Sequence, residues 1–421
     1  MVELSEIFEE WNSYAEKKIL KSREINLSKI ITTSKTKIIT VTGVRRSGKT
    51  SILLLIYQKI KNSGEKCAYI NLEDNRIKDH PEILDEIIKW SGDEGTLMLD
   101  EITSVKGWEG WLARNHELLK GKLKIIISSS RHTLMKPTKS LRGRILPLEL
   151  YPLSFKEFLK FNNINIEKTT AGAGIVEKNL KEFLTNGGFP EISLIKGKTE
   201  KVELLNTYFR DIIGLDVAEI TKESVSVVEL FGKYVLNTSY FSASKCLNFY
   251  KSAGYKISKQ SILEIEKHSQ GSYLFFFIPI ASRNIKDKNQ YPRKAYPIDT
   301  GFMNSITGKS DYGKLYENVV FIELKRRILL NDEITYWKNK EGKEVDFVIT
   351  RGIKTKEIIQ VVYEIKEQNT KDREVKGLIG CAKEYGIKTG LIITKNYEGK
   401  EIIDGIKIRY LPLSKWLLSL K

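Results

Sequence analysis

Short apolar runs alternate with helix-like stretches over residues 37 to 150. Runs of this kind, separated by helical segments, are typical of strands in a mainly parallel sheet that helices cover on both faces. The predicted strands are residues 37–42, 67–72, 96–99, 123–127 and 145–150. We therefore expect an α/β fold for the N-terminal part of the chain.

The pattern changes twice after this region. Residues 155 to about 220 are helical, with a glycine-proline break in NGGFPE at residues 186–191. After Ser226, helix-like segments lead to the β-rich runs SYLFFFIPI and KAYPIDTGF. Helices followed by a short hairpin suggest a winged helix-turn-helix. From about residue 313 to 421, strands and helices alternate again.

The loop after the first predicted strand reads GVRRSGKT, which matches GxxxxGK[ST] without a mismatch. Glycines let successive backbone N–H groups point at phosphate oxygens, and the following helix presents its positive end to the same anion. We expect Lys49 to reach the β and γ phosphates and Thr50 to bind Mg²⁺. Arg46 either contacts the nucleotide or is an exposed arginine of the loop, and the second alternative is at least as well supported. The predicted nucleotide-binding residues are Gly43, Arg46, Ser47, Gly48, Lys49, Thr50 and Ser51.

About fifty residues later, the apolar run TLML ends in Asp100 and Glu101. Alone, such a pair is more often a solvated strand end. After a phosphate-binding loop at this spacing, Asp100 is placed to hold Mg²⁺ and Glu101 to orient or deprotonate the attacking water. This region lacks a guanine-reading Asn-Lys-x-Asp stretch. The sequence therefore predicts ATP and Mg²⁺ as cofactors and ATP hydrolysis as the reaction.

Composition adds three expectations. A chain of 421 residues should form two to four domains. A net charge of +17 favours polyanionic partners such as nucleic acid, although a lysine-rich surface of a heat-adapted protein explains it equally well. Three scattered cysteines without metal-ligand spacing, and no apolar run near the ~20 residues that span a bilayer, favour a cytoplasmic protein without a membrane segment.

Taken in order, the motifs resemble those of AAA-superfamily ATPases, common in archaea, that carry a C-terminal nuclease-like domain. The resemblance covers nearly the whole chain. It is carried by GVRRSGKT, LMLDEI, SLRGRILPLELYPLSFKEFL, GGFPE, YFRDI, YPIDTGF, YENVVFIEL and GKEVDFVI. It implies an α/β fold class with a P-loop NTPase core of the AAA type, a helical and winged-helix middle, and a C-terminal domain similar to the PD-(D/E)XK nuclease fold. The expected boundaries are 1–152 for the ATPase core with an N-terminal helix, 153–222 for a helical lid, 223–308 for the winged helix and 309–421 for the nuclease-like domain.

The resemblance also implies a sensor and an arginine. The predicted strand at 123–127 runs into three serines, and Ser130 would be the polar sensor near the γ-phosphate, with an ordinary strand-end turn as the alternative. Ser129 replaces the glycine that is usual in the family. Arg142 and Arg144 are candidates for an arginine that acts across a subunit boundary of a homo-oligomer, and Arg144 occupies the Gly-Arg position of the family. Surface salt bridging is the alternative.

Basic residues cluster in GYKISKQSILEIEKH and just before it. Ser258 is placed to cap a helix whose N-terminal end would enter a DNA groove. Glu264 and Glu266 in the same helix would repel DNA if they faced it, so packing between domains is an equal alternative. The candidate DNA-binding residues are Lys251, Lys256 and Lys259, with Lys267 further along the helix.

A metal-dependent nuclease of the PD-(D/E)XK type needs a helix carboxylate, a strand aspartate and a Glu-x-Lys pair on the next strand. Glu317 and Asp346 supply the first two. If the hairpin turns within residues 351–356, Asp346 lies opposite Gln360 or Val362, so these occupy the places of Glu and Lys. Glu364 and Lys366 match the Glu-x-Lys pair in residue type. They lie about 13 Å further along the strand, which rises ~3.3 Å per residue.

These observations favour a degenerate nuclease fold that binds or scaffolds. For the whole chain they leave three functions. The first is an ATPase that couples hydrolysis to work on DNA. The second is a nucleotide-dependent regulatory switch with little turnover, and the third is an ATP-coupled DNA nuclease.

Overall fold

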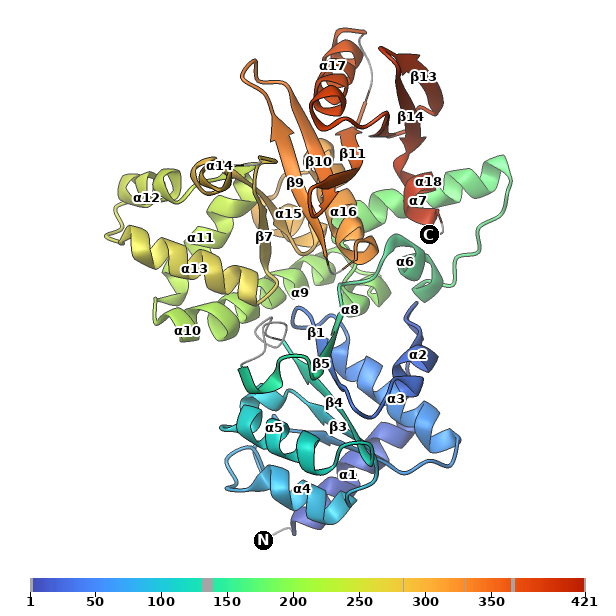
Figure 1. Cartoon of the computed structure of the whole chain (residues 1–421), viewed down its shortest axis with the longest axis vertical. Helices are drawn as coiled ribbons and strands as arrows, with labels where there is room; N and C mark the ends of the chain where they lie inside the picture. The colour runs from blue at the N-terminus through green and yellow to red at the C-terminus, as the bar shows by residue number, and fades with distance from the viewer. Residues whose placement is uncertain (1–2, 131–138, 283, 330, 365–367, 420–421) are drawn as a thin grey trace. The chain divides into compact units, whose positions relative to one another are not determined.

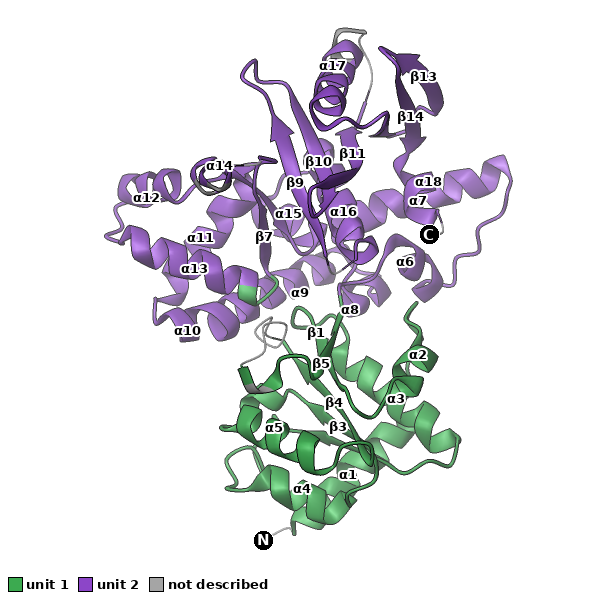
Figure 2. Cartoon of the chain, in the orientation of Figure 1, with its two compact units in different colours: residues 1–150, 271–273 green, residues 151–270, 274–421 purple. Residues whose placement is uncertain are grey.

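The computed structural model describes residues 3–130, 139–282, 284–329, 331–364 and 368–419 (Figure 1). The chain divides into two compact units. The first contains residues 1–150 and 271–273, and the second contains residues 151–270 and 274–421 (Figure 2). The expected core boundary at 152 lies close to the division after Leu150. The boundaries expected at 222 and 308 fall inside the second unit and stay predictions.

The first unit is built on a five-stranded sheet in the order β2-β3-β4-β1-β5, in which every neighbouring pair is parallel. The strands are β1 (Ile38–Thr42), β2 (Cys67–Asn71), β3 (Gly95–Asp100), β4 (Leu123–Ser129) and β5 (Ile145–Glu149). The five predicted strands and their parallel arrangement are therefore confirmed. Because β1 and β3 run parallel to β4, which lies between them, the phosphate-binding loop and the acidic pair both follow carboxyl ends of strands at the same edge of the sheet.

Helices cover both faces of this sheet because its side chains alternate. In β4, Ile125 and Ile127 belong to one core cluster, whereas Ile126 belongs to the other. The first cluster takes in α4 (Ile83–Ser91) and α5 (Trp108–Leu118), and the second takes in α3 (Lys49–Asn62). The other helices among the described residues of the unit are α1 (Leu4–Lys17), α2 (Leu27–Thr32) and the short 3₁₀ turns η1 (Ile102–Ser104) and η3 (Lys139–Leu141).

The second unit begins with the helices that the pattern predicted. They are α6 (Phe155–Phe161), α7 (Thr170–Asn186), α8 (Pro190–Leu194), α9 (Lys198–Asp211), a π-helical segment, η4 (Ile212–Ala218), and α10 (Glu219–Thr221). Ser154 and Glu157 form a capping box that starts α6. Pro190 starts α8, as expected from the fixed backbone angle of proline at a first helical turn.

A small antiparallel sheet follows, in the order β6-β8-β7. The elements in chain order are α11 (Val225–Asn237), β6 (Tyr240–Phe241), α12 (Ala243–Ser252), α13 (Lys259–Gly271), β7 (Phe275–Ile278), α14 (Ile285–Gln290) and β8 (Arg293–Pro297). The predicted cap of α13 is confirmed, since Ser258 Oγ accepts from the backbone N of Ser261 at 2.9 Å. The second β-rich run is only partly a strand, because it turns after Pro297 into α15 (Thr300–Thr307).

The C-terminal part contains a six-stranded mixed sheet in the order β13-β14-β12-β11-β10-β9. Its elements are α16 (Tyr312–Arg327), β9 (Asp332–Lys338), β10 (Glu344–Arg351), β11 (Lys354–Val362), α17 (Gln368–Tyr385), β12 (Thr389–Thr394), β13 (Gly399–Ile403), β14 (Ile406–Pro412) and α18 (Leu413–Leu418). Leu378 of α17 belongs to the same core as Val348 and Ile392 of the sheet. Within the described residues, no helix combines the length and hydropathy needed to cross a bilayer.

Two of the sequence motifs, GGFPE and YPIDTGF, meet at the buried side chain of Asp299. Its Oδ2 accepts from the backbone N of Gly188 at 2.7 Å, and its Oδ1 accepts from the backbone N of Gly301 at 2.8 Å. Gly187 has a φ of +78°, and a Cβ there would lie 1.5 Å from Asp299 Oδ1. The buried carboxylate therefore explains Gly187, whereas a Cβ on Gly188 would lie 2.5 Å from the carbonyl oxygen of Leu153 and one on Gly301 would lie 2.6 Å from that of Asn186.

Candidate functional site

The phosphate-binding loop joins β1 to α3 and depends on glycine at two places. A Cβ on Gly43 would lie 2.1 Å from the carbonyl oxygen of Leu150, and Gly48 has a φ of +97° directly before α3. Lys49 is 5% exposed. Its Nζ donates to the carbonyls of Gly43 at 3.2 Å and Val44 at 3.3 Å. The predicted loop thus has the backbone shape that a phosphate cradle requires.

Both predicted carboxylates lie at the same sheet edge as this loop. Lys49 Nζ is 3.4 Å from Glu101 Oε1. Thr50 is hydrogen-bonded to Asp100, which is 1% exposed. Burial, and after it the charge of Glu101, raises the pKa of Asp100, whereas hydroxyl donors oppose the shift. A hydroxyl and a carboxylate in contact form the oxygen donor set that a hard cation such as Mg²⁺ prefers.

Sequence reasoning missed two hydroxyls that hold Asp100. Tyr69 Oη donates to Asp100 Oδ2 at 2.9 Å, and Ser128 Oγ donates to Asp100 Oδ1. Ser128 Oγ also accepts from the backbone N of Glu101 at 2.9 Å. The sequence marked Ser128 only by its position directly after the predicted strand at 123–127, and the structure shows that this strand neighbours β3. Ser128 therefore fixes both members of the acidic pair.

The predicted sensor, Ser130, also lies in this site. Its backbone N donates to Glu101 Oε2 at 3.0 Å, and its Oγ lies 3.5 Å from the same oxygen. Ser129, which replaces the glycine usual in the family, bonds Thr103 through the two hydroxyls at 3.0 Å. The structure thus accommodates the serine, and the role of Ser130 toward a γ-phosphate stays a prediction.

Charged residues around the loop extend the site. Arg45 pairs with Glu73 at 3.7 Å, and burial followed by the charge of Glu101 raises the pKa of Glu73. Arg46 is exposed with a φ of +69°. Arg23 donates to the carbonyl of Ser47 at 2.9 Å, a contact that sequence reasoning missed. Among the described residues, the buried Oγ of Ser47 has no hydrogen-bond partner, so a donor is available inside the loop.

The two candidate arginines lie just before β5. Arg144 pairs with Glu117 at 3.0 Å and donates to the carbonyl of Ala113 at 3.1 Å. Both partners belong to α5 of the same chain, which agrees with the salt-bridging alternative. Arg142 is exposed. An arginine role across a subunit boundary stays a prediction.

The candidate DNA-binding lysines lie around the turn between α12 and α13. Lys251 lies near the end of α12, Lys256 lies in the turn and Lys259 begins α13, and all three are exposed. Glu266 is buried and paired with Arg293, so it does not face solvent. Glu264 pairs with Lys267 at 3.2 Å. The charge conflict expected along this helix is therefore largely removed by internal ion pairs.

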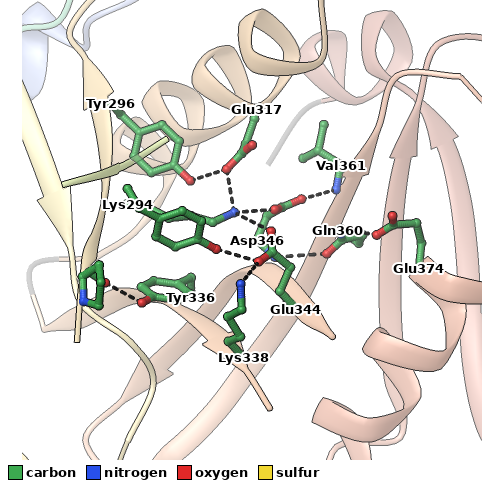
Figure 3. A network of polar contacts seen from close by, with 12 residues as sticks. Lys294, Tyr296, Glu317, Tyr336, Lys338, Glu344, Asp346, Gln360, Val361 and Glu374 are labelled. Carbon is green, nitrogen blue, oxygen red and sulfur yellow. Dashed lines mark hydrogen bonds and ion pairs between the residues drawn. The ribbon is translucent and has the colours of Figure 1, made fainter. Parts of the chain in front are cut away.

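The C-terminal carboxylates converge, but on a lysine that sequence reasoning missed (Figure 3). Lys294 Nζ donates to Glu317 Oε1 at 2.8 Å and to Asp346 Oδ1 at 2.6 Å. Its distance to Glu344 Oε1 is 3.8 Å. The available signal was the alternation in β8, where Lys294 is buried on the same face as Tyr296.

The strand register places Gln360 beside Asp346. Phe347 pairs with Ile359, so the next position sets Asp346 opposite Gln360, one of the two registers expected. Gln360 Oε1 accepts from the backbone N of Asp346 at 3.0 Å. Glu364 follows the end of β11 and pairs with Lys395 at 2.8 Å. Lys366 lies outside the described residues.

Burial dominates the electrostatics of this centre. It raises the pKa of Asp346, although the charge of Lys294 opposes the shift. For Lys294, burial disfavours the ammonium, but the charges of Asp346 and Glu317 outweigh it and hold the pKa well above its usual value. The pair therefore stabilises a buried cation.

Comparisons with known proteins agree with the N-terminal site. Residues 35–159 match a sequence profile described as an AAA domain, and residues 312–416 match a domain of unknown function, DUF4143. The uncharacterized protein MJ1544 of Methanocaldococcus jannaschii is 34% identical over 415 residues, which cover 95% of this chain and 92% of that one. An uncharacterized protein of Haemophilus influenzae is 29% identical over 423 residues, covering 96% and 100%.

Among solved structures, AMPPCP-bound DnaA from Aquifex aeolicus aligns with a TM-score of 0.31 and 19% identity, over 61% of this chain and 87% of that one. A TM-score this low does not establish a shared fold over the aligned length. The relative with 34% identity over nearly the full length does establish a family. The chain therefore belongs to the same family as MJ1544 and carries the nucleotide-binding AAA domain of the AAA-superfamily ATPases in its N-terminal unit.

Proposed function

We propose that the protein is a Mg²⁺-dependent ATPase. The observation that carries this proposal is the meeting of Lys49, Thr50, Asp100 and Glu101 at one sheet edge, where Ser128 bonds the carboxylate of Asp100 and the backbone N of Glu101. A site that only binds a nucleotide does not need a second carboxylate. Here the second carboxylate, that of Glu101, accepts from the backbone N of Ser130 and lies 3.4 Å from Lys49 Nζ, which supports hydrolysis.

Each residue has a separate task in this proposal. The loop amides and Lys49 bind the phosphates, and Thr50 with Asp100 would hold Mg²⁺. The ion, when bound, neutralises charge on the phosphate oxygens. Glu101 orients the attacking water, and its carboxylate is fixed for this task by the backbone N of Ser130 at 3.0 Å.

The test compares nucleotide binding with turnover. Lys49→Ala should abolish binding or turnover, because the phosphate charge loses its cation. Glu101→Gln should still bind ATP but hydrolyse it slowly, by roughly 10²-fold or more, since water positioning by a general base contributes about 10²–10⁴-fold. Glu94→Gln makes the same change at the exposed residue just before β3 and should leave turnover unchanged. Full turnover in Glu101→Gln would remove Glu101 from its assigned role.

We also infer that the protein binds nucleic acid through phosphates, using the exposed lysines of the turn between α12 and α13. The order α11-β6-α12-α13-β7-α14-β8, with the sheet order β6-β8-β7, supports a winged helix in which α12 and α13 form the helix-turn-helix and α13 begins at Lys259. The net charge of +17 supports a polyanionic partner. Contacts of this kind give affinity and little sequence information.

Salt dependence tests this inference. Affinity for duplex DNA should fall by roughly 10³ or more between 50 and 200 mM salt if six or more phosphates are contacted. Changing Lys256 and Lys259 together to Gln should lower the salt slope by about 2. The same two substitutions at the exposed Lys376 and Lys388 serve as the control. A flat salt response, or an unchanged slope in the first pair, contradicts the assignment.

Measuring ATP turnover with and without duplex, single-stranded and branched DNA distinguishes an ATPase that does work on DNA from a regulatory switch. Stimulation by DNA supports an ATPase that does work on DNA. Binding of ATP with negligible turnover in every condition supports a regulatory switch.

A further inference from the structure

In the centre formed by Glu317, Asp346 and Lys294, a buried protein ammonium group occupies the position between the two carboxylates, although the Glu317 side chain itself is 23% exposed. Lys294 and Asp346 are 3% and 4% exposed. Tyr296 donates to Glu317 at 2.6 Å, and Tyr240 donates to Glu344 at 2.6 Å. A metal that cleaves DNA must keep a position open to the scissile phosphate and to water. Here the positive group is a protein side chain, surrounded by the residues it joins.

The carboxylates nevertheless have the geometry of cation ligands. One oxygen from α16 and one from β10 approach the same nitrogen at 2.8 and 2.6 Å (Figure 3). The other oxygen of Asp346 accepts from the backbone N of Val361 at 2.8 Å, so the carboxylate cannot turn freely. Gln360 adds a second restraint, since it bonds the backbone of Asp346 and also Glu374 at 2.7 Å. The position of the cation is thus fixed by the fold.

We propose that Lys294 is the resident cation of this centre, and that its ammonium takes the place of a divalent metal between Glu317 and Asp346. In this proposal the ammonium group balances the charges of Glu317 and Asp346, so the C-terminal domain needs no metal ion at this position. In the described residues, no group of three or more His, Cys, Asp or Glu side chains is placed to hold a metal ion. Two carboxylates with water could still hold Mn²⁺ or Mg²⁺ weakly if the lysine charge were removed.

The same contact has a structural role. Lys294 belongs to β8 of the small sheet, whereas Glu317 belongs to α16 and Asp346 to β10 of the six-stranded sheet. A buried charge pair is costly to break from one side, because an uncompensated charge is left behind. Lys294 therefore ties the segment that contains α12 and α13 to the C-terminal sheet, and the nuclease-like fold serves as the anchor for that segment.

The experiment follows thermal unfolding of the full chain, without nucleotide, in EDTA and in Mn²⁺. Wild type should give the same midpoint in both. Lys294→Met should unfold at a lower temperature in EDTA, and Mn²⁺ should raise its midpoint by roughly 3 °C or more. The double variant Lys294→Met with Asp346→Asn removes both charges, so it should recover part of the midpoint in EDTA and lose the response to Mn²⁺.

The N-terminal nucleotide site is the same in all these variants. Any effect of Mn²⁺ at that site is therefore shared, and the differences in midpoint between the variants report on the C-terminal centre. If Lys294→Met aggregates, refolding it with and without Mn²⁺ gives the same readout as recovered folded protein. A Mn²⁺ response of wild type that Asp346→Asn removes, or Mn²⁺-dependent DNA cleavage lost in Asp346→Ala, would overturn the proposal. It is also overturned if Lys294→Met shows no response to Mn²⁺, because the carboxylates would then not define a cation position.

Discussion

The buried carboxyl group of Asp299 makes stability depend on pH in a predictable direction. It is 5% exposed, and burial raises its pKa to about 7 although two backbone N–H donors and Arg326 oppose the shift. In the unfolded chain an aspartic acid has its ordinary pKa near 3.8. Between about pH 4 and pH 7, the folded state therefore binds one more proton than the unfolded state. The contribution of Asp299 to stability should therefore be largest below pH 4, fall as the pH rises and level off above pH 7.

The magnitude follows from the size of this shift. One pKa unit corresponds to about 1.4 kcal/mol, so the two units between pH 5 and pH 7 remove about 3 kcal/mol. Asp299→Asn has nearly the same shape and does not titrate. Its NH₂ group must face one of the N–H groups of Gly188 and Gly301, which costs about 1–3 kcal/mol for an unpaired buried donor. Wild type should therefore be the more stable protein at pH 5 and should lose that advantage at pH 8.

Hydrogen exchange measures this locally, which is necessary because a chain of two units does not have a single unfolding free energy. Protection of the peptides that contain α8 and α15 is compared between wild type and Asp299→Asn at pH 5 and pH 8, after correction for intrinsic exchange. Asp311→Asn makes the same change at the exposed N-cap of α16, and only the excess over this control counts. An equal difference at both pH values would refute the reasoning, because the donors would then be holding Asp299 ionised throughout.

Two further predictions concern named contacts. Gly187→Ala should lower the unfolding temperature of the second unit far more than Gly254→Ala, because both residues have positive φ, which costs an alanine about 1–2 kcal/mol, but only Gly187 has a carboxylate oxygen at 1.5 Å from the added carbon. Equal losses would show that the clash is relieved. Ser128→Ala should lower ATP turnover by roughly tenfold or more, because it leaves Asp100 Oδ1 and the backbone N of Glu101 each without a bond worth about 1–3 kcal/mol. Ser130→Ala keeps the backbone bond to Glu101 and should cost less, and the reverse order in steady-state kinetics would mark Ser130 as the sensor.

The sequence predicted features that depend on local spacing. The motif fixed the phosphate-binding loop, because only glycine permits the backbone at Gly48 and the close approach at Gly43. The run lengths located all five strands of the first sheet within two residues, since short apolar runs between helices form buried parallel strands. In the second unit, the two-residue period of strands narrowed the partner of Asp346 to Gln360 or Val362, and the structure selects Gln360.

Contacts between distant segments were decided only by the tertiary structure. Ser128 and Tyr69 reach Asp100 because β2 and β4 both lie beside β3, and strand order is not written in any one strand. Lys294 had no motif to mark it. The role of Lys294 depends on the packing that brings α16 and β10 to it, because a buried charge is tolerated where an opposite charge lies beside it.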